Sequence, residues 1–279
     1  MRPSRLVFPC IAILLGIVMS GAASAQMLMP HRAVYDLALL ETSDKSDIGG
    51  LTGRWVFEFS GSACEGYTLK SRIVMRFEMA EGPNLVDQQV TSFEAADSKT
   101  FRFVTKSFVD EQLDSEVRGT ARLEGEGTVV DYEQPEQVEK RFAPTLFPTA
   151  QLRELLGKAK AGERFYETAI FDGTEFTDHA VTVSVVVGDP KPVAEDDAEK
   201  EALGELAADS FLPVTAAYFD GDNEQADGEE TSDYNVSFKL HEGGVQRDMV
   251  IRYADYAMSA KLVDLAVFEQ QPCEPETKD

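Results

Sequence analysis

The chain has 279 residues, and its 50 acidic residues outnumber its 26 basic ones to give a net charge of −24. Such a charge repels phosphate backbones and anionic lipid surfaces, which argues against nucleic-acid binding. After residue 25 no segment approaches the roughly 20 apolar residues that a membrane-spanning helix needs, so we expect a protein that does not span a membrane.

Residues 1–25 have the pattern of a cleaved secretory signal peptide. A basic start over 1–5 precedes an apolar stretch over 6–19, and Ala23-Ser24-Ala25 supplies the small residues of a cleavage site. This predicts a periplasmic mature protein over 26–279, with 24 basic against 50 acidic residues and a net charge near −26. Cys10 lies inside the apolar stretch and does not follow the cleavage site, which argues against a lipoprotein anchor.

Alternation of apolar and polar residues dominates the mature chain and predicts half-buried antiparallel strands. The clearest case is 68–79, where Leu69, Ile73, Met75, Phe77 and Met79 share one face. Other strands are expected over 54–59, 101–109, 117–124, 128–132, 165–171, 181–187 and 260–268, with a hairpin of 234–240 and 249–253 around Gly243-Gly244. A length of about 254 residues is compatible with one all-β domain over 26–279.

One segment has helical periodicity instead. After Phe147-Pro148, Thr149 is the expected N-cap, and Gly162 is placed to end the helix. The apolar positions Leu152, Leu155, Leu156 and Ala159 form one face, as in an amphipathic helix. We expect this face to be buried inside or across the mouth of a curved sheet, and the alternative is a helix exposed for a partner.

Two acidic segments interrupt the pattern. Residues 189–209 are interpreted as a solvated insertion with a short helix around 198–207. Residues 220–232 form a second acidic loop that resembles a calcium-binding loop, but Gln225 stands where such a loop requires glycine. No metal site is therefore predicted there.

The remaining chemistry-bearing residues are few. Removal of Cys10 leaves Cys64 and Cys273, and two cysteines in an oxidising compartment usually form a disulfide.

His31, His179 and His241 lack metal-ligand spacing, and His31 and His241 are expected at the surface. No nucleophile elbow, phosphate-binding loop or dinucleotide fingerprint occurs, so we predict no enzyme, no cofactor and no metal. The apolar strand faces, with Met75 and Met79, fit either ordinary core packing or an adaptable apolar cavity.

Several short motifs together resemble a known family. They are His31–Leu37, Cys64-Glu65-Gly66-Tyr67, Phe147-Pro148-Thr149, Arg247–Val250 and Tyr253–Tyr256 before Pro272-Cys273. As a set they are similar to the alphaproteobacterial cell-envelope integrity proteins of the EipB family, over essentially the whole mature chain.

The resemblance implies a mainly β fold, a strongly curved antiparallel sheet called a β-spiral or open barrel, with one main amphipathic helix and a shape like the lipoprotein carriers LolA and LolB. It also implies a bond between Cys64 and Cys273, a role in envelope integrity and stress resistance, and association with a periplasmic tetratricopeptide-repeat protein. We therefore predict a non-enzymatic periplasmic protein that binds envelope partners. The alternative is a carrier or chaperone that shelters a lipid or lipoprotein acyl chain in the concave sheet.

Overall fold

The structure is a computed structural model that describes residues 28–220, 231–270 and 273. The predicted signal peptide, and most of the second acidic loop with Gln225, lie outside the described residues. Within the described ranges, no helix is both long and apolar enough to cross a membrane.

The described residues form fifteen strands in a single sheet, and every strand pair in it is antiparallel. The strands are β1 (His31–Thr42), β2 (Ile48–Ser62), β3 (Gly66–Met79), β4 (Gly82–Glu94), β5 (Thr100–Val109), β6 (Gln112–Glu124), β7 (Gly127–Gln134), β8 (Val138–Phe142), β9 (Phe165–Ile170), β10 (Val181–Val187), β11 (Lys191–Pro192), β12 (Ser210–Phe219), β13 (Tyr234–His241), β14 (Gln246–Tyr253) and β15 (Tyr256–Val267). The helices are α1 (Pro148–Lys160), α2 (Lys200–Leu203) and the 3-10 helix η1 (Gly204–Ala208).

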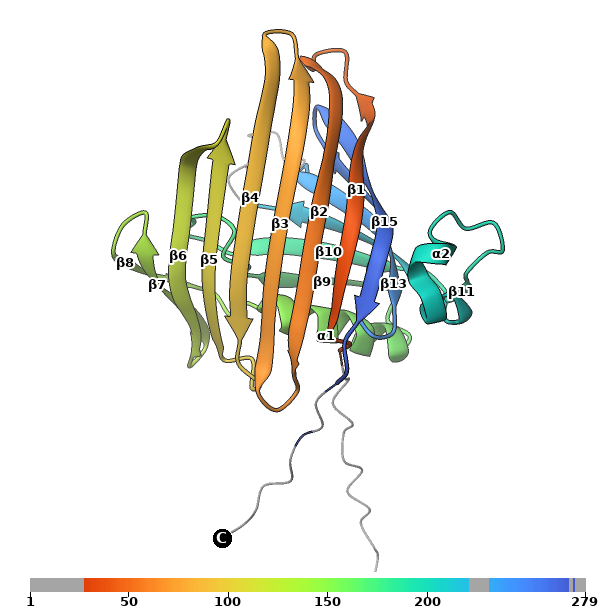
Figure 1. Cartoon of the computed structure of the whole chain (residues 1–279). Coiled ribbons are helices and arrows are strands. Elements are labelled where there is room, and N and C mark those ends of the chain that lie inside the picture. Colours follow the sequence, from red (N-terminus) through yellow and green to blue (C-terminus); the bar gives the residue numbers. More distant parts are fainter. Residues whose placement is uncertain (1–27, 221–230, 271–272, 274–279) are drawn as a thin grey trace, which may run out of the picture.

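The strand order explains the shape of the molecule. It runs β8-β7-β6-β5-β4-β3-β2-β1-β15-β14-β13-β12-β10-β9, with β11 paired to β12, so the first and last strands are neighbours in the middle. The chain leaves one edge of the sheet at β8, forms α1, and re-enters at the opposite edge as β9. In Figure 1 the strands β1 to β6 make one wall, β9 and β10 cross behind them, and α1 lies at the lower end. The predicted curved, mainly β antiparallel fold is confirmed.

Helix α1 is packed on the inside of this sheet. Leu155, Leu156 and Ala159 are buried in the main hydrophobic core, together with residues of β1, β2 and β12 to β15. The prediction of a helix buried by the curved sheet is therefore confirmed for this apolar face. Thr149 is not its N-cap: Phe147 occupies that position and makes no side-chain cap. A buried carboxylate on β4 takes over the capping role, as described below.

A second, smaller core anchors the start of α1. Phe147 is fully buried and stacks on Phe101, with ring centroids 5.2 Å apart. Phe103 and Phe171 pack edge-on against each other in the same cluster, at 5.3 Å. Because Phe147 directly precedes α1, this aromatic cluster determines where the helix enters the barrel.

The acidic segment 189–209 is more ordered than a solvated insertion. It forms β11, α2 and η1, and Leu203 and Leu206 are buried in the main core. Asp197 and Glu199 form ion pairs with Arg247, whose side chain is fully buried. The expectation of a short helix is correct, and the expectation that the whole segment is solvated is wrong.

Candidate binding cavity in the curved sheet

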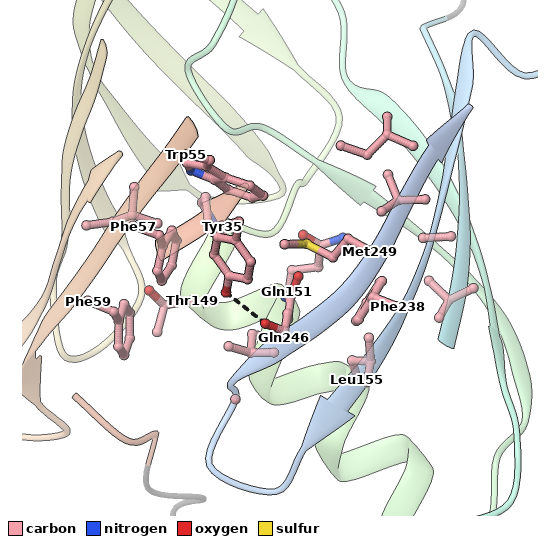
Figure 2. A pocket seen from close by; sticks show the side chains of 18 of the residues that line it. Tyr35, Trp55, Phe57, Phe59, Thr149, Gln151, Leu155, Phe238, Gln246 and Met249 are labelled. Carbon is pink, nitrogen blue, oxygen red and sulfur yellow. Dashed lines mark hydrogen bonds between the residues drawn. The ribbon is translucent and has the colours of Figure 1, made fainter. Parts of the chain in front are cut away.

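An apolar cavity lies between β2 and the opposite wall of β12, β13 and β14, next to the first turns of α1 (Figure 2). Its volume is about 290 Å³, close to the lower end of the range for small-molecule sites. The residues around it are His31, Tyr35, Trp55, Phe57, Phe59, Leu69, Pro148, Thr149, Gln151, Leu152, Leu155, Val185, Ala216, Tyr218, Tyr234, Val236, Phe238, Gly243, Gly244, Gln246, Met249 and Ile251.

Strand β2 supplies an aromatic wall. Trp55, Phe57 and Phe59 are spaced by two residues, so they project from the same face of the strand into the cavity (Figure 2). The indole N–H of Trp55 donates to the Ser71 hydroxyl over 2.8 Å. The only strongly polar atom of this wall is thus already bonded, and the cavity meets flat apolar rings.

Tyr35 links this wall to the opposite one. Its ring packs against Trp55 with a centroid separation of 5.1 Å, and its hydroxyl donates to the Gln246 carbonyl oxygen over 2.7 Å (Figure 2). Burial raises the pKa of Tyr35 well above its usual value, and the nearby Glu199 adds to this shift. The hydroxyl therefore stays protonated and acts as a fixed cross-brace between β1 and β14.

A buried carboxylate holds α1 against the cavity. Glu94 on β4 is 2% exposed, and its two oxygens accept hydrogen bonds from the backbone N–H groups of Thr149 and Ala150 at 2.7 and 3.0 Å. Carboxylates are favourable at helix N-termini because the first N–H groups have no partner within the helix. Burial raises the pKa of Glu94, while these hydrogen bonds oppose the rise. This contact places Thr149, Gln151 and Leu155 along the cavity.

The β13–β14 turn closes one end of the cavity, and its two glycines allow it to pack closely on its neighbours. Gly244 has a φ of +92°, and a Cβ there would lie 3.0 Å from a Leu152 methyl carbon. A Cβ on Gly243 would lie 2.9 Å from Met29 Cβ. The turn thus packs directly on α1 and on the segment before β1, and a larger side chain at either glycine would collide with them.

The cavity is electrically neutral. No Asp, Glu, Lys or Arg is among its lining residues, and burial lowers the pKa of His31, the one lining residue that could carry a positive charge near neutral pH. An ion placed inside would lose its hydration without gaining a counter-charge. In the part of the chain that the structure describes, no cluster of three His, Cys, Asp or Glu side chains could hold a metal ion. The arrangement is suited to binding an uncharged apolar group.

The residues singled out from the sequence lie partly elsewhere. Cys64, in the β2–β3 turn, is joined by a disulfide to Cys273, with the two Cα atoms 5.8 Å apart, and neither residue lines the cavity. Met75 packs on the main core and Met79 is 39% exposed, so the methionine that reaches the cavity is Met249. The strand expected over 54–59 lies within β2, and its Trp55, Phe57 and Phe59 form the cavity wall, which the strand pattern alone did not predict.

Two histidine predictions are wrong. His31 is 3% exposed and His241 is fully buried, although both were expected at the surface. His31 packs among the aromatic rings of β2, and His241 accepts a hydrogen bond from the buried Arg247. His31 is covered by rings of the neighbouring strand β2, and His241 by the guanidinium of Arg247 across the β13–β14 turn.

The fold and the cavity together define a class: an open, barrel-like antiparallel β protein with an internal helix and an apolar interior. A family model described as EipB-like matches residues 22–269. The chain belongs to this EipB-like family.

Two relatives support the assignment. The Cell envelope integrity protein EipB of Brucella abortus (strain 2308) is 49% identical over 251 residues, which cover 90% of this chain and 88% of that protein. The crystal structure of a beta-barrel-like protein of domain of unknown function DUF1849 from Brucella abortus is similar with a TM-score of 0.82 and 48% identity. The match covers 87% of this chain and 99% of the crystallised one.

Proposed function

We propose that this protein supports the integrity of the cell envelope from the periplasm, by non-covalent binding and without catalysis. The observation that carries the proposal is the 49% identity, over 90% of the chain, to a cell envelope integrity protein. The signal-peptide pattern of residues 1–25 supports the location.

Deletion of the gene tests this proposal. We expect the deletion strain to become more sensitive to cell-wall antibiotics and detergents, and a plasmid copy of the intact gene to restore resistance. A copy without residues 2–25 is the matched control, because a protein that acts in the periplasm cannot complement from the cytoplasm. Unchanged resistance in the deletion strain would contradict the envelope role, and full rescue by the leaderless copy would contradict the location.

The cavity favours a second, more specific function. An apolar space of about 290 Å³ inside a strongly curved sheet could shelter part of an acyl chain of a lipid or lipoprotein. Ordinary core packing would fill such a space with side chains, since protein interiors are close-packed. Native mass spectrometry of protein purified from the periplasm should then show bound lipid, and repeated absence of extra mass would argue against a carrier.

A protein partner is the other finer proposal. The family resemblance stated from the sequence motifs implies a periplasmic tetratricopeptide-repeat protein as partner. Affinity purification from periplasmic extract, followed by identification of both proteins and lipids, distinguishes this proposal from the carrier. Enrichment of a repeat protein without lipid favours partner binding, whereas lipid without a protein favours the carrier.

A further inference from the structure

The imidazole of His31 in the cavity wall has one nitrogen atom without a hydrogen-bond partner among the described residues. His31 lies at the start of β1 and is 97% buried, with its ring centroid 5.5 Å from that of Phe57 and 6.2 Å from that of Phe59. Its ring lines the cavity together with these two aromatic residues. Buried polar atoms are usually hydrogen-bonded, so each nitrogen atom of this imidazole is expected to have a hydrogen-bond partner.

The hydrogen bond of His31 defines its tautomer. Nδ1 lies 2.7 Å from the carbonyl oxygen of Met29. A carbonyl oxygen can only accept, so Nδ1 carries the proton and donates it. Burial lowers the pKa of His31, which keeps the ring neutral near pH 7. Nε2 is then an acceptor, and among the described residues it has no hydrogen-bond partner.

Several of the other polar side chains around the cavity have partners, but the Tyr234 hydroxyl and the Gln246 side-chain amide have none among the described residues. Tyr35 and Trp55 donate to Gln246 and Ser71. Thr149 is hydrogen-bonded through its side chain to Glu94, and Tyr218 to Gln151. Unlike the unpartnered hydroxyl and amide, which can donate or accept, neutral His31 Nε2 can only accept, and its ring lines the cavity beside Phe57 and Phe59.

We propose that the cavity selects an uncharged apolar chain bearing a hydrogen-bond donor, a hydroxyl or an amide N–H, and that His31 Nε2 accepts this bond. The inference rests on the proposed role of the cavity as an acyl-chain site. A chain without a donor would displace water from Nε2 and leave a buried acceptor unpaired, which costs affinity. A charged group would have no counter-charge in the wall.

The single tryptophan of the chain makes binding directly measurable. Trp55 lines the cavity, so its fluorescence should change when a chain enters. Protein purified from periplasm and stripped of lipid is titrated with two matched pairs of probes. The first pair is dodecan-1-ol and its methyl ether, and the second is N-methyldodecanamide and N,N-dimethyldodecanamide. In each pair both members are uncharged and only one has a donor.

We expect the donor-bearing member to bind about three- to tenfold more tightly, the usual worth of one neutral hydrogen bond. The pair with the larger ratio identifies the source of the donor: the alcohol pair points to hydroxylated chains, and the amide pair to acylated amines. Equal affinity within both pairs would overturn the proposal while leaving acyl-chain binding intact. No fluorescence change with any probe, together with no lipid by mass spectrometry, would overturn the carrier function as well.

Two variants assign the acceptor. His31→Phe keeps a ring of similar shape without Nε2, so it should bind both members of each pair equally. Tyr234→Phe removes a hydroxyl elsewhere in the lining and should keep the wild-type preference. A preference that survives in His31→Phe would overturn the role of His31. If His31→Phe does not fold, Tyr234→Phe decides the question. Loss of the preference for donor-bearing probes in Tyr234→Phe would overturn the role of His31, whereas an unchanged preference supports that role.

Discussion

The imidazole of His241 is fully buried against the guanidinium of Arg247. Arg247 Nε donates to His241 Nε2 over 2.9 Å, which requires that nitrogen to be unprotonated. Burial, and then the charge of Arg247, lower the pKa of His241 to about 4. In the unfolded chain the pKa is near 6.5, so between pH 6.5 and 4 the unfolded chain binds a proton that the native protein does not.

This difference predicts a loss of stability in mild acid. Because the unfolded state gains the proton, the free energy of unfolding should fall by roughly 1–3 kcal/mol as the pH drops from 6.5 to 4. His241→Gln keeps an acceptor for Arg247 and does not titrate, so it should lose less over this range. Urea unfolding at pH 7 and pH 4.5, followed by Trp55 fluorescence, measures both proteins.

His179 supplies a control of opposite sign. Hydrogen bonds and charge from Asp178 and Asp220 raise its pKa, so its contribution is present at low pH and is lost as the pH rises through the raised value. His179→Gln should therefore leave the acid-induced loss intact or deepen it. If His241→Gln and the wild type lose equal stability between pH 7 and 4.5, the neutral buried imidazole is contradicted.

The sequence could not reveal these buried histidines. The partner of His241 is Arg247, across a hairpin, and the carboxylates that balance Arg247 stand about 50 residues away at Asp197 and Glu199. His31 is buried by rings from another strand, whose register against β1 is a property of the fold. A lone histidine has no spacing pattern, whereas the every-second-residue pattern of Trp55, Phe57 and Phe59 is visible in the sequence and predicted the strand, though not the cavity that it lines.

At the scale of elements, ion pairs fasten the acidic segment 189–209 to the sheet. Arg247 on β14 contacts Asp197 Oδ2 at 3.0 Å and Glu199 Oε2 at 2.9 Å. Glu199 also accepts from the backbone N–H of Leu262 on β15 over 2.7 Å. Burial alone would raise the pKa of Asp197, but hydrogen bonds from Lys239, the Glu199 backbone and Arg247 lower it to about 2. Asp197 is thus held as an anion beside the buried guanidinium, which Glu199 also contacts.

Arg247→Met should therefore be strongly destabilising. It leaves Asp197 and Glu199 in their buried positions without the cation between them, and breaking a buried pair from one side costs about 3–5 kcal/mol. Arg54→Met is the matched control, because the Arg54–Asp36 pair is exposed and such pairs contribute about 0–1 kcal/mol. The urea midpoints of the two variants measure the difference. Equal midpoints would show that the segment is not fastened by this network.

Alternation of apolar and polar residues predicted the strands in which every second residue is apolar. It missed other strands for identifiable reasons. Strand β12 carries Pro213 between two neighbouring strands, a position where proline usually argues against a strand. Strand β4 contains Asp87-Gln88-Gln89, which interrupts any apolar face. Helix α1 was predicted from its periodicity, but its cap was not, because Glu94 lies 55 residues before Thr149.

At the scale of the whole molecule, the pairing of β1 with β15 brings the two ends of the described chain together. His31 stands opposite Val267, and the Phe268 N–H donates to the Pro30 carbonyl oxygen over 2.8 Å. Local patterns predict that strands exist, but not that the first pairs with the last, because that contact spans more than 200 residues. The family resemblance implied the curved sheet, and the cysteine count independently suggested where its ends are joined.

The disulfide between Cys64 and Cys273 then closes a loop of 209 positions. In the chain-entropy model a cross-link over such a loop restricts the unfolded chain and contributes up to roughly 5 kcal/mol. Two hydrogen bonds already hold the residues after β15 beside the start of the described chain in the native state: the Phe268 N–H donates to the Pro30 carbonyl oxygen, and the Gln270 side chain donates to the Leu28 carbonyl oxygen. The cross-link should therefore act mainly on the unfolded chain. Cys64→Ser should accordingly lower the melting temperature by several degrees and increase cleavage by proteases.

Two comparisons make this prediction specific. Cys273→Ser and the double variant should have the same melting temperature as Cys64→Ser, since each removes the same bond. The melting temperature of the reduced wild type should be close to that of the three variants. Thiol counting on the unreduced wild type under denaturing conditions should find no free cysteine in the mature chain. Free thiols in the mature wild type, or variants with the melting temperature of the oxidised wild type, would mean that the sheet alone holds the two ends of the chain together.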